Sequence, residues 1–223
     1  MPFRNRAEAG QRLAQALLLY KNQTPIILAL PRGGIPVAAE VARVLKAPLD
    51  LIVARKVGVP HHEELAMGAV VDGTDPLIVR NENVINAAGV TEADFASVCK
   101  QEVEEIQRRR RRYIGDRPPL DLKGRVVIMI DDGIATGATV RAALRSIRRQ
   151  KPKQLILAVP VAPSAVLSDL RGEADAIVCL ESYENFGAVG FYYSDFPQVS
   201  DNQVKQILDE LRPSDSIREF QNS

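Results

Sequence analysis

Short apolar runs rich in β-branched residues alternate along this chain with longer segments in which apolar positions recur every three or four residues. The first pattern is typical of buried strands and the second of amphipathic helices. Strands are expected at residues 25–30, 49–55, 125–130, 154–160 and 175–180. Helices are expected near residues 5–21, 35–46, 91–112, 138–150, 163–170 and 201–211, with a hairpin across 67–80 that turns at Asp72-Gly73. The alternation predicts an α/β fold: an open, mainly parallel β-sheet flanked by helices, with right-handed crossovers.

Composition favours one compact domain over residues 1–223. With 223 residues, 46% of them hydrophobic, the chain is long enough to bury a core of its own. A net charge of +1 gives no general attraction to nucleic acid. Cys99 and Cys179 lack the spacing of a disulfide framework or a zinc site. There is no signal-peptide pattern and no apolar stretch of membrane-spanning length, so a cytoplasmic protein is expected, with no membrane partner.

The most informative segment is residues 126–139, where two acids follow a fully apolar strand. Asp131 and Asp132 stand at the C-terminal end of that strand, and ligands of open parallel sheets gather beyond such ends. The small, hydroxylated loop 135–139 then leads into a helical pattern, and a helix start of this kind favours a phosphate. The segment therefore predicts a site for a phosphorylated sugar.

This segment resembles the phosphoribosyl-pyrophosphate (PRPP) signature of type I phosphoribosyltransferases, in which four apolar residues, two acids and three variable positions precede Thr-Gly-x-Thr. The resemblance implies that fold, with a core near 3–180, a small C-terminal aromatic hood near 181–200 and a C-terminal helix near 201–211. It implies that catalytic Asp131 and Asp132 hold the ribose hydroxyls and bind the cofactor Mg²⁺ only indirectly, through PRPP and water. It also implies that the 5′-phosphate is bound by Ala135, Thr136, Gly137, Ala138 and Thr139.

A second segment, Pro31-Arg32-Gly33-Gly34, follows the apolar strand at 25–30. Two glycines allow a backbone to approach an anion closely, and the guanidinium fork of arginine matches phosphate oxygens. The segment resembles the pyrophosphate-binding loop of the same family, which implies that Arg32, Gly33 and Gly34 bind pyrophosphate and that the Pro31–Arg32 peptide is cis.

A third segment continues from the strand near 51–57 into residues 58–64. The resemblance implies that this is the catalytic flexible loop, in which Arg55 and Lys56 face the pyrophosphate and Glu63 and Glu64 lie on a mobile flap. One of these glutamates is a candidate to handle the acceptor's proton. The pair 61–62 is interpreted as solvated loop histidines rather than metal ligands, because adjacent strand residues point to opposite faces.

Five consecutive arginines at 108–112 span more than one helical turn and cannot form a single basic face. Glu104 and Glu105 precede Arg108 and Arg109 by four residues, a spacing that favours ion pairs on a solvated helix. The run is therefore interpreted as a solvated helix face rather than a nucleic-acid site.

Residues 180–196 hold six of the chain's eleven aromatic residues. Within the resemblance they form the hood over the nucleobase, with Phe186 stacking on the base and Asp195, or Glu184, meeting its edge. The alternative is a hydrophobic cap or a subunit interface. Ala135 stands where hypoxanthine- and guanine-using relatives carry an aspartate, so the acceptor stays open.

The resemblance implies a phosphoribosyltransferase that uses PRPP and Mg²⁺ to transfer a 5-phosphoribosyl group to a nucleobase or related nitrogen acceptor, and that releases pyrophosphate. The expected partners are PRPP, a small-molecule acceptor and a second copy in a homodimer, without nucleic acid. Two alternatives remain: a PRPP-binding regulatory protein without turnover, and a structural subunit.

Overall fold

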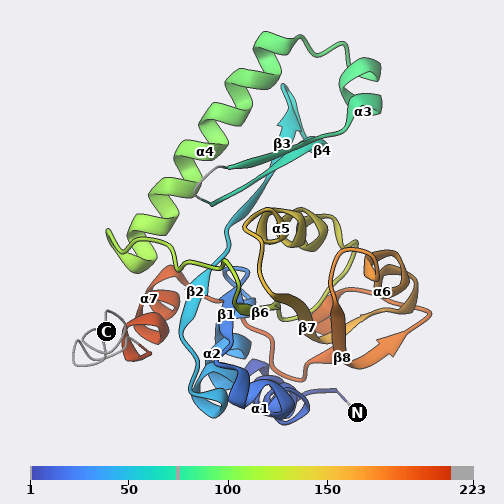
Figure 1. The fold of residues 1–223 in the computed structure, drawn as a ribbon. Coiled ribbons are helices and arrows are strands. Elements are labelled where there is room, and N and C mark those ends of the chain that lie inside the picture. Colours follow the sequence, from blue (N-terminus) through green and yellow to red (C-terminus); the bar gives the residue numbers. More distant parts are fainter. Residues whose placement is uncertain (1, 74–75, 212–223) are drawn as a thin grey trace.

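A parallel sheet forms the centre of the protein, as a computed structural model describing residues 2–73 and 76–211 shows (Figure 1). Its five strands lie in the order β2-β1-β6-β7-β8, and every neighbouring pair is parallel. The strands are β1 (Ile26–Ala29), β2 (Leu49–Leu51), β6 (Val126–Ile130), β7 (Gln154–Pro163) and β8 (Ala176–Tyr183). The predicted fold class is confirmed.

Helices cover both faces of this sheet. Alternate residues of each strand point to opposite faces, so the strands contribute to two cores. Ile128 and Ile130 of β6 join a core with the helices that precede β1 and β2, whereas Val127 and Met129 join a core with the helices that follow β6 and β7. In the first core, α1 (Arg6–Ala16) and η1 (Leu18–Gln23) precede β1, α2 (Gly34–Leu45) precedes β2, and the C-terminal helix α7 (Asp201–Glu210) packs with them; the same core continues into buried residues of the segment 57–114. The helices of the second core are α5 (Ala138–Arg149) and α6 (Ser164–Leu170). A short helix η2 (Val189–Tyr192) follows β8. None of the helices in the described residues is long and apolar enough to cross a membrane.

A second, antiparallel sheet with two helices extends away from the central sheet (Figure 1). We call residues 54–114 the arm. It contains β3 (Ala54–Val59), β4 (His62–Val71), β5 (Leu77–Arg80), α3 (Glu82–Ala87) and α4 (Glu92–Ile114). The β4–β5 pairing confirms the hairpin expected across 67–80.

The structure corrects two expectations for the start of the arm. The strand expected at 49–55 is divided into β2 and β3, and the loop expected at 58–64 is instead a hairpin with a two-residue turn at Pro60-His61. The sequence did not show this because residues 62–66 are all exposed, so they carry no alternation of apolar and polar positions.

Arg110 of α4 connects the arm to the central sheet. Its guanidinium donates to both carboxylate oxygens of Asp50 on β2, at 3.0 and 3.1 Å, and to Asp72 Oδ2 at 3.1 Å. The interpretation of 108–112 as a solvated face is therefore only partly right. Arg109 pairs with Glu105 as expected, and Arg108 pairs with Glu105 rather than with Glu104. The side chain of Arg110, however, is only 16% exposed.

The buried carboxyl of Asp72 makes stability depend on pH. Burial raises the pKa of Asp72 to about 6 from 3.8, against the opposing effect of Arg110. Because the folded protein keeps a proton there that the unfolded chain has lost, stability decreases as the pH rises from about 4 to 6, by about 3 kcal/mol for this group. We expect Asp72→Asn to remove that part of the slope in urea unfolding measured across this range. A variant that follows the wild-type pH dependence would contradict this expectation.

Candidate active site

The two sequence segments that resemble substrate-binding motifs lie side by side at the C-terminal edge of the central sheet. Their strands, β1 and β6, are hydrogen-bonded neighbours, and the Leu30 amide donates to the Ile130 carbonyl at 3.0 Å where both strands end. The Pro31–Arg32 peptide is cis, as the resemblance implied. Residues about 100 positions apart in sequence therefore form one site.

Gly33 and Gly34 are in close contact with the acid pair. A Cβ atom at Gly33 would lie 2.1 Å from Asp132 Oδ2, and one at Gly34 would lie 2.8 Å from the Ile130 carbonyl oxygen and 3.2 Å from Asp131 Oδ1. The sequence predicted that these glycines admit an anion. In the structure, the carboxylate of Asp132 occupies the space beside Gly33 that an anionic ligand was expected to fill.

Arg6 of α1 also belongs to the site, and sequence reasoning missed it. Its Nε donates to Asp132 Oδ2 at 2.7 Å, and its Nη1 donates to the Pro197 carbonyl at 2.7 Å. The guanidinium also lies over the Phe196 ring, 3.6 Å from its centroid. Arg6 stands in a polar helix with several other arginines and in no motif, so the sequence carries no signal for this contact.

The two acids have different surroundings although they are adjacent. Burial raises the pKa of Asp131 well above its usual value, and the neighbouring negative charge of Asp132 adds to the effect. Asp132 is held by Arg6, and its backbone carbonyl accepts a hydrogen bond from the Tyr193 hydroxyl at 2.5 Å. Burial therefore disfavours the charged form of Asp131, whereas Asp132 is a carboxylate fixed in place by Arg6.

The loop expected to bind phosphate is open to solvent. Ala135, Thr136, Ala138 and Thr139 are exposed, and α5 begins at Ala138 without a side-chain cap. Gly137 precedes it with φ 77°, a left-handed conformation that favours glycine. Because the first backbone N–H groups of a helix have no partner within it, this start offers donors to an anion.

The hairpin residues expected to be catalytic lie apart from the acid pair, since Figure 1 shows the β3–β4 hairpin pointing away from the central sheet. Arg55 pairs with Glu102 of α4, and Lys56 pairs with Glu64 across the hairpin at 3.1 Å. Glu63 is exposed. The structure does not bring these four residues, Arg55, Lys56, Glu63 and Glu64, into the site.

The aromatic segment is largely packed on itself and on the N-terminus. Phe186 stacks on Tyr192 at 4.7 Å, and Tyr193 contacts both Phe3 and Phe196. This packing supports the alternative of a hydrophobic cap. The base-binding role of Phe186 stays a prediction, with one face of its ring already covered by Tyr192.

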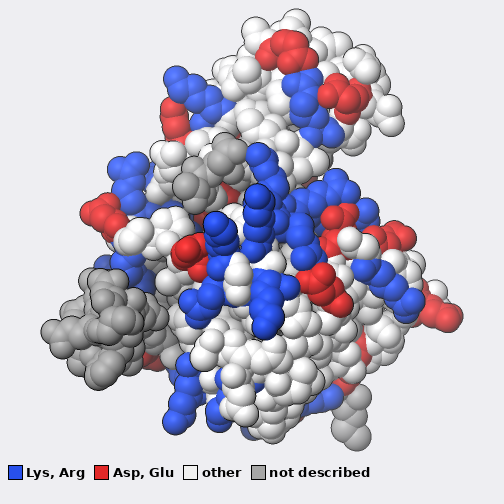
Figure 2. Space-filling view, in the orientation of Figure 1, with Lys and Arg blue, Asp and Glu red and all other residues white. Residues whose placement is uncertain are grey.

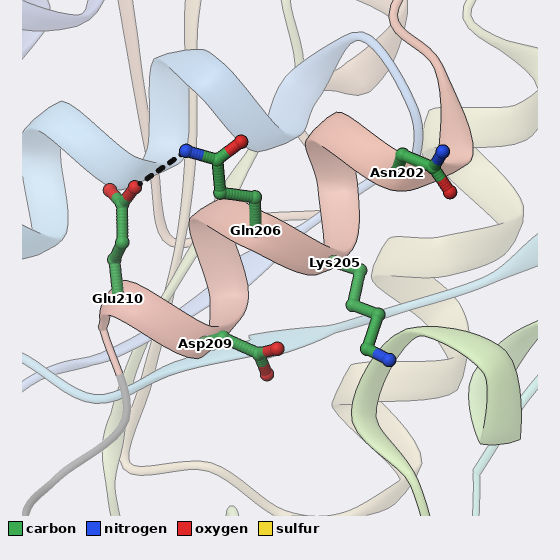
Figure 3. Close-up of a pocket in the computed structure, with 5 residues that line it drawn as sticks. All are labelled: Asn202, Lys205, Gln206, Asp209 and Glu210. Carbon is green, nitrogen blue, oxygen red and sulfur yellow. Dashed lines mark hydrogen bonds between the residues drawn. The ribbon is translucent and has the colours of Figure 1, made fainter.

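Two of the hollows near the C-terminal helix α7 bear on where the site lies. One, of about 300 Å³, is lined by Asp195 together with Arg6 and Pro197. The other lies on α7 and is lined by polar side chains, among which Gln206 donates to Glu210 at 3.1 Å (Figure 3). The α7 hollow contains none of the residues that the sequence singles out, so the candidate site is the edge around Asp131.

No group of three or more His, Cys, Asp or Glu residues within 2–73 and 76–211 could hold a metal ion. His61 and His62 are exposed, but they do not lie in a loop: His61 is in the hairpin turn and His62 begins β4. The acid pair alone suits an ion that arrives with its own ligands, because Mg²⁺ keeps several waters and needs few protein carboxylates.

Comparison with known proteins decides the family. The model of the family described as "Phosphoribosyl transferase domain" matches residues 3–195. The chain belongs to this phosphoribosyltransferase family. Two Mycobacterium tuberculosis proteins, from strains CDC 1551 and H37Rv, are 42% identical over 207 residues and are named "Putative phosphoribosyl transferase". The match covers 93% of this chain but only 46% of each relative, so the chain spans about half their length.

Solved structures share the fold of this chain. The crystal structure of TT1426 from Thermus thermophilus is 38% identical, with a TM-score of 0.80 over 96% of this chain and all of that one. The AQ2163 protein from Aquifex aeolicus, 13% identical over 83% of this chain and 78% of that one, has a TM-score of 0.51 and shares the fold. The phosphoribosyltransferase fold predicted from the sequence is thus confirmed.

The unequal surroundings of the two acids predict opposite effects of the same substitution. Asp132→Asn leaves the buried charge of Arg6 without its counter-charge and should lower the free energy of unfolding by about 3 kcal/mol. Asp131→Asn removes a carboxyl whose charged form burial disfavours, so stability at pH 7 should stay level or rise. Urea unfolding of both variants tests this. An Asp131→Asn variant that is less stable than Asp132→Asn would contradict it.

Proposed function

We propose that the protein transfers a 5-phosphoribosyl group from PRPP to a nucleobase or related nitrogen acceptor, with Mg²⁺, and releases pyrophosphate. The observation that carries this proposal is the meeting of three parts at one sheet edge: the Arg32 loop, the acid pair and the uncapped start of α5. They match the three parts of the donor, which are a diphosphate, a ribose and a 5′-phosphate.

In this proposal the residues act by position and charge. Backbone N–H groups of residues 135–139 hold the 5′-phosphate, Asp131 and Asp132 accept hydrogen bonds from the ribose hydroxyls, and Arg32 faces the diphosphate. The bond between the anomeric carbon and the diphosphate oxygen breaks, a bond to the acceptor nitrogen forms, and that nitrogen gives its proton to Glu63 or Glu64. Negative charge on Asp132 favours the positive charge that develops on the ribose ring.

Mg²⁺ would be held by Asp131 and Asp132 through water and PRPP, and when bound it would neutralise charge on the diphosphate. The arm supplies the remaining part of the proposal. Arg55, Lys56, Glu63 and Glu64 would reach the diphosphate and the acceptor if the β3–β4 hairpin closed over the site, as lids of many enzymes do. The short connection at 52–53 between β2 and β3 is where such a movement would pivot.

A regulatory protein that binds PRPP without turnover is the second candidate, and surface charge bears on it. Figure 2 shows Lys and Arg gathered over the middle of one face, where α5 lies in Figure 1. Three arginines of α5 are paired, however: Arg141 and Arg145 with Glu173, and Arg148 with Asp175. These pairs reduce the charge available to a nucleic acid, so we favour the enzyme.

Turnover separates the two candidates. The protein, incubated with PRPP, Mg²⁺ and a panel of nucleobases, should release pyrophosphate with at least one acceptor. Asp131→Asn, which we expect to fold stably, should lower that rate by about 10²-fold or more, since an amide, unlike the carboxyl, cannot ionise beside the reacting sugar. Binding of PRPP without pyrophosphate release for any acceptor would instead support the regulator.

A further inference from the structure

The structure brings two arginines of distant elements to one carboxylate. Arg112 Nη1 at the end of α4 lies 2.7 Å from Asp201 Oδ2, and Arg32 Nη1 of the loop after β1 lies 3.5 Å from Asp201 Oδ1. The Tyr113 hydroxyl donates to the same Oδ1 at 2.7 Å. Asp201 is the first residue of α7, so α4, α7 and the loop that leads into α2 all meet at this point.

A cavity of about 240 Å³ adjoins this cluster. Both guanidiniums line it, and they are partly exposed there, with 35% of the Arg32 side chain and 49% of the Arg112 side chain accessible. The full lining is Arg32, Arg112, Gln198, Val199, Ser200, Asp201 and Asn202. Apart from one valine, every lining side chain is polar or charged.

Positive charge exceeds negative charge around this cavity. Asp201 faces Arg32 and Arg112, and Arg109 acts on it from the preceding turn of α4. The Tyr113 hydrogen bond and these arginines keep the pKa of Asp201 below its usual value, so the carboxylate is ionised and still leaves the arginines in excess. Each guanidinium has five N–H donors in a fork that matches phosphate oxygens, and one contact to Asp201 uses only part of them.

We propose that Arg112 is a second ligand of the donor's diphosphate, which it binds together with Arg32 across this cavity, and that Asp201 is the counter-charge that holds the two guanidiniums together before the ligand binds. The identity of the ligand rests on the proposed function. In the arginine run, Arg108 and Arg109 form solvated pairs and Arg110 binds Asp50 and Asp72, so the ligand contact is assigned to Arg112.

Isothermal titration calorimetry of the full chain with sodium pyrophosphate tests this role of Arg112 directly. Arg112→Gln should weaken pyrophosphate binding about tenfold or more, because a charge-assisted contact is lost. Arg111→Gln is the matched control: it removes the same charge from the adjacent residue, which does not line the cavity.

Three outcomes would overturn the inference: no pyrophosphate binding by the wild type, wild-type affinity in Arg112→Gln, or an equal loss in Arg111→Gln, which would mean that only overall charge matters. The proposed function fails separately. If pyrophosphate binds through Arg112 but PRPP releases no pyrophosphate with any acceptor, the pyrophosphate site is supported and the transferase function is wrong. If PRPP still releases pyrophosphate, and Arg112→Gln leaves the pyrophosphate Kd and the KM for PRPP unchanged, the proposed function is supported and the proposed role of Arg112 is wrong.

Discussion

The contact on which the candidate site depends is the one between the Asp132 carboxylate and its two neighbours, Arg6 and Gly33. The carboxylate fills the space where a side chain at position 33 would lie, and Arg6 supplies the opposite charge from the other side. A buried charge is costly unless it is paired, so none of the three can change alone without disturbing the other two. The acid pair, the Arg32 loop and α1 are held together by this arrangement.

Because of this arrangement, Asp131 and Asp132 differ in their surroundings although they are adjacent acids in the sequence. Asp132 has a fixed partner in Arg6, which the Pro197 carbonyl and the Phe196 ring hold in turn. Burial raises the pKa of Asp131, and the weaker opposing effect of Arg6 does not cancel that rise. The pair therefore combines one anchored carboxylate with one whose charged form burial disfavours, a difference typical of functional sites.

The sequence predicted the central sheet well because its strands are buried on both faces, and such strands are uninterrupted apolar runs in the sequence. It placed the acid pair and the glycine loop together because both follow strands of one parallel sheet. The hairpin at 54–71 was missed, since its outer residues face solvent on both sides and leave no periodicity. Arg6 and Arg112 were missed for another reason: an arginine's partner is set by tertiary packing, and the local sequence is the same whether the side chain faces solvent or a carboxylate.

The arginine run of α4 shows how one helix serves several purposes through geometry alone. Successive residues point in directions about 100° apart, so neighbours meet different surroundings. Arg109 pairs with Glu105 on its own helix, Arg110 ties the arm to Asp50 and Asp72, and Arg112 reaches Asp201 beside Arg32. Because the same helix is fixed to the sheet by Arg110 and meets the Arg32 cavity through Arg112, any movement of the arm about its base must also change the arginines that line that cavity.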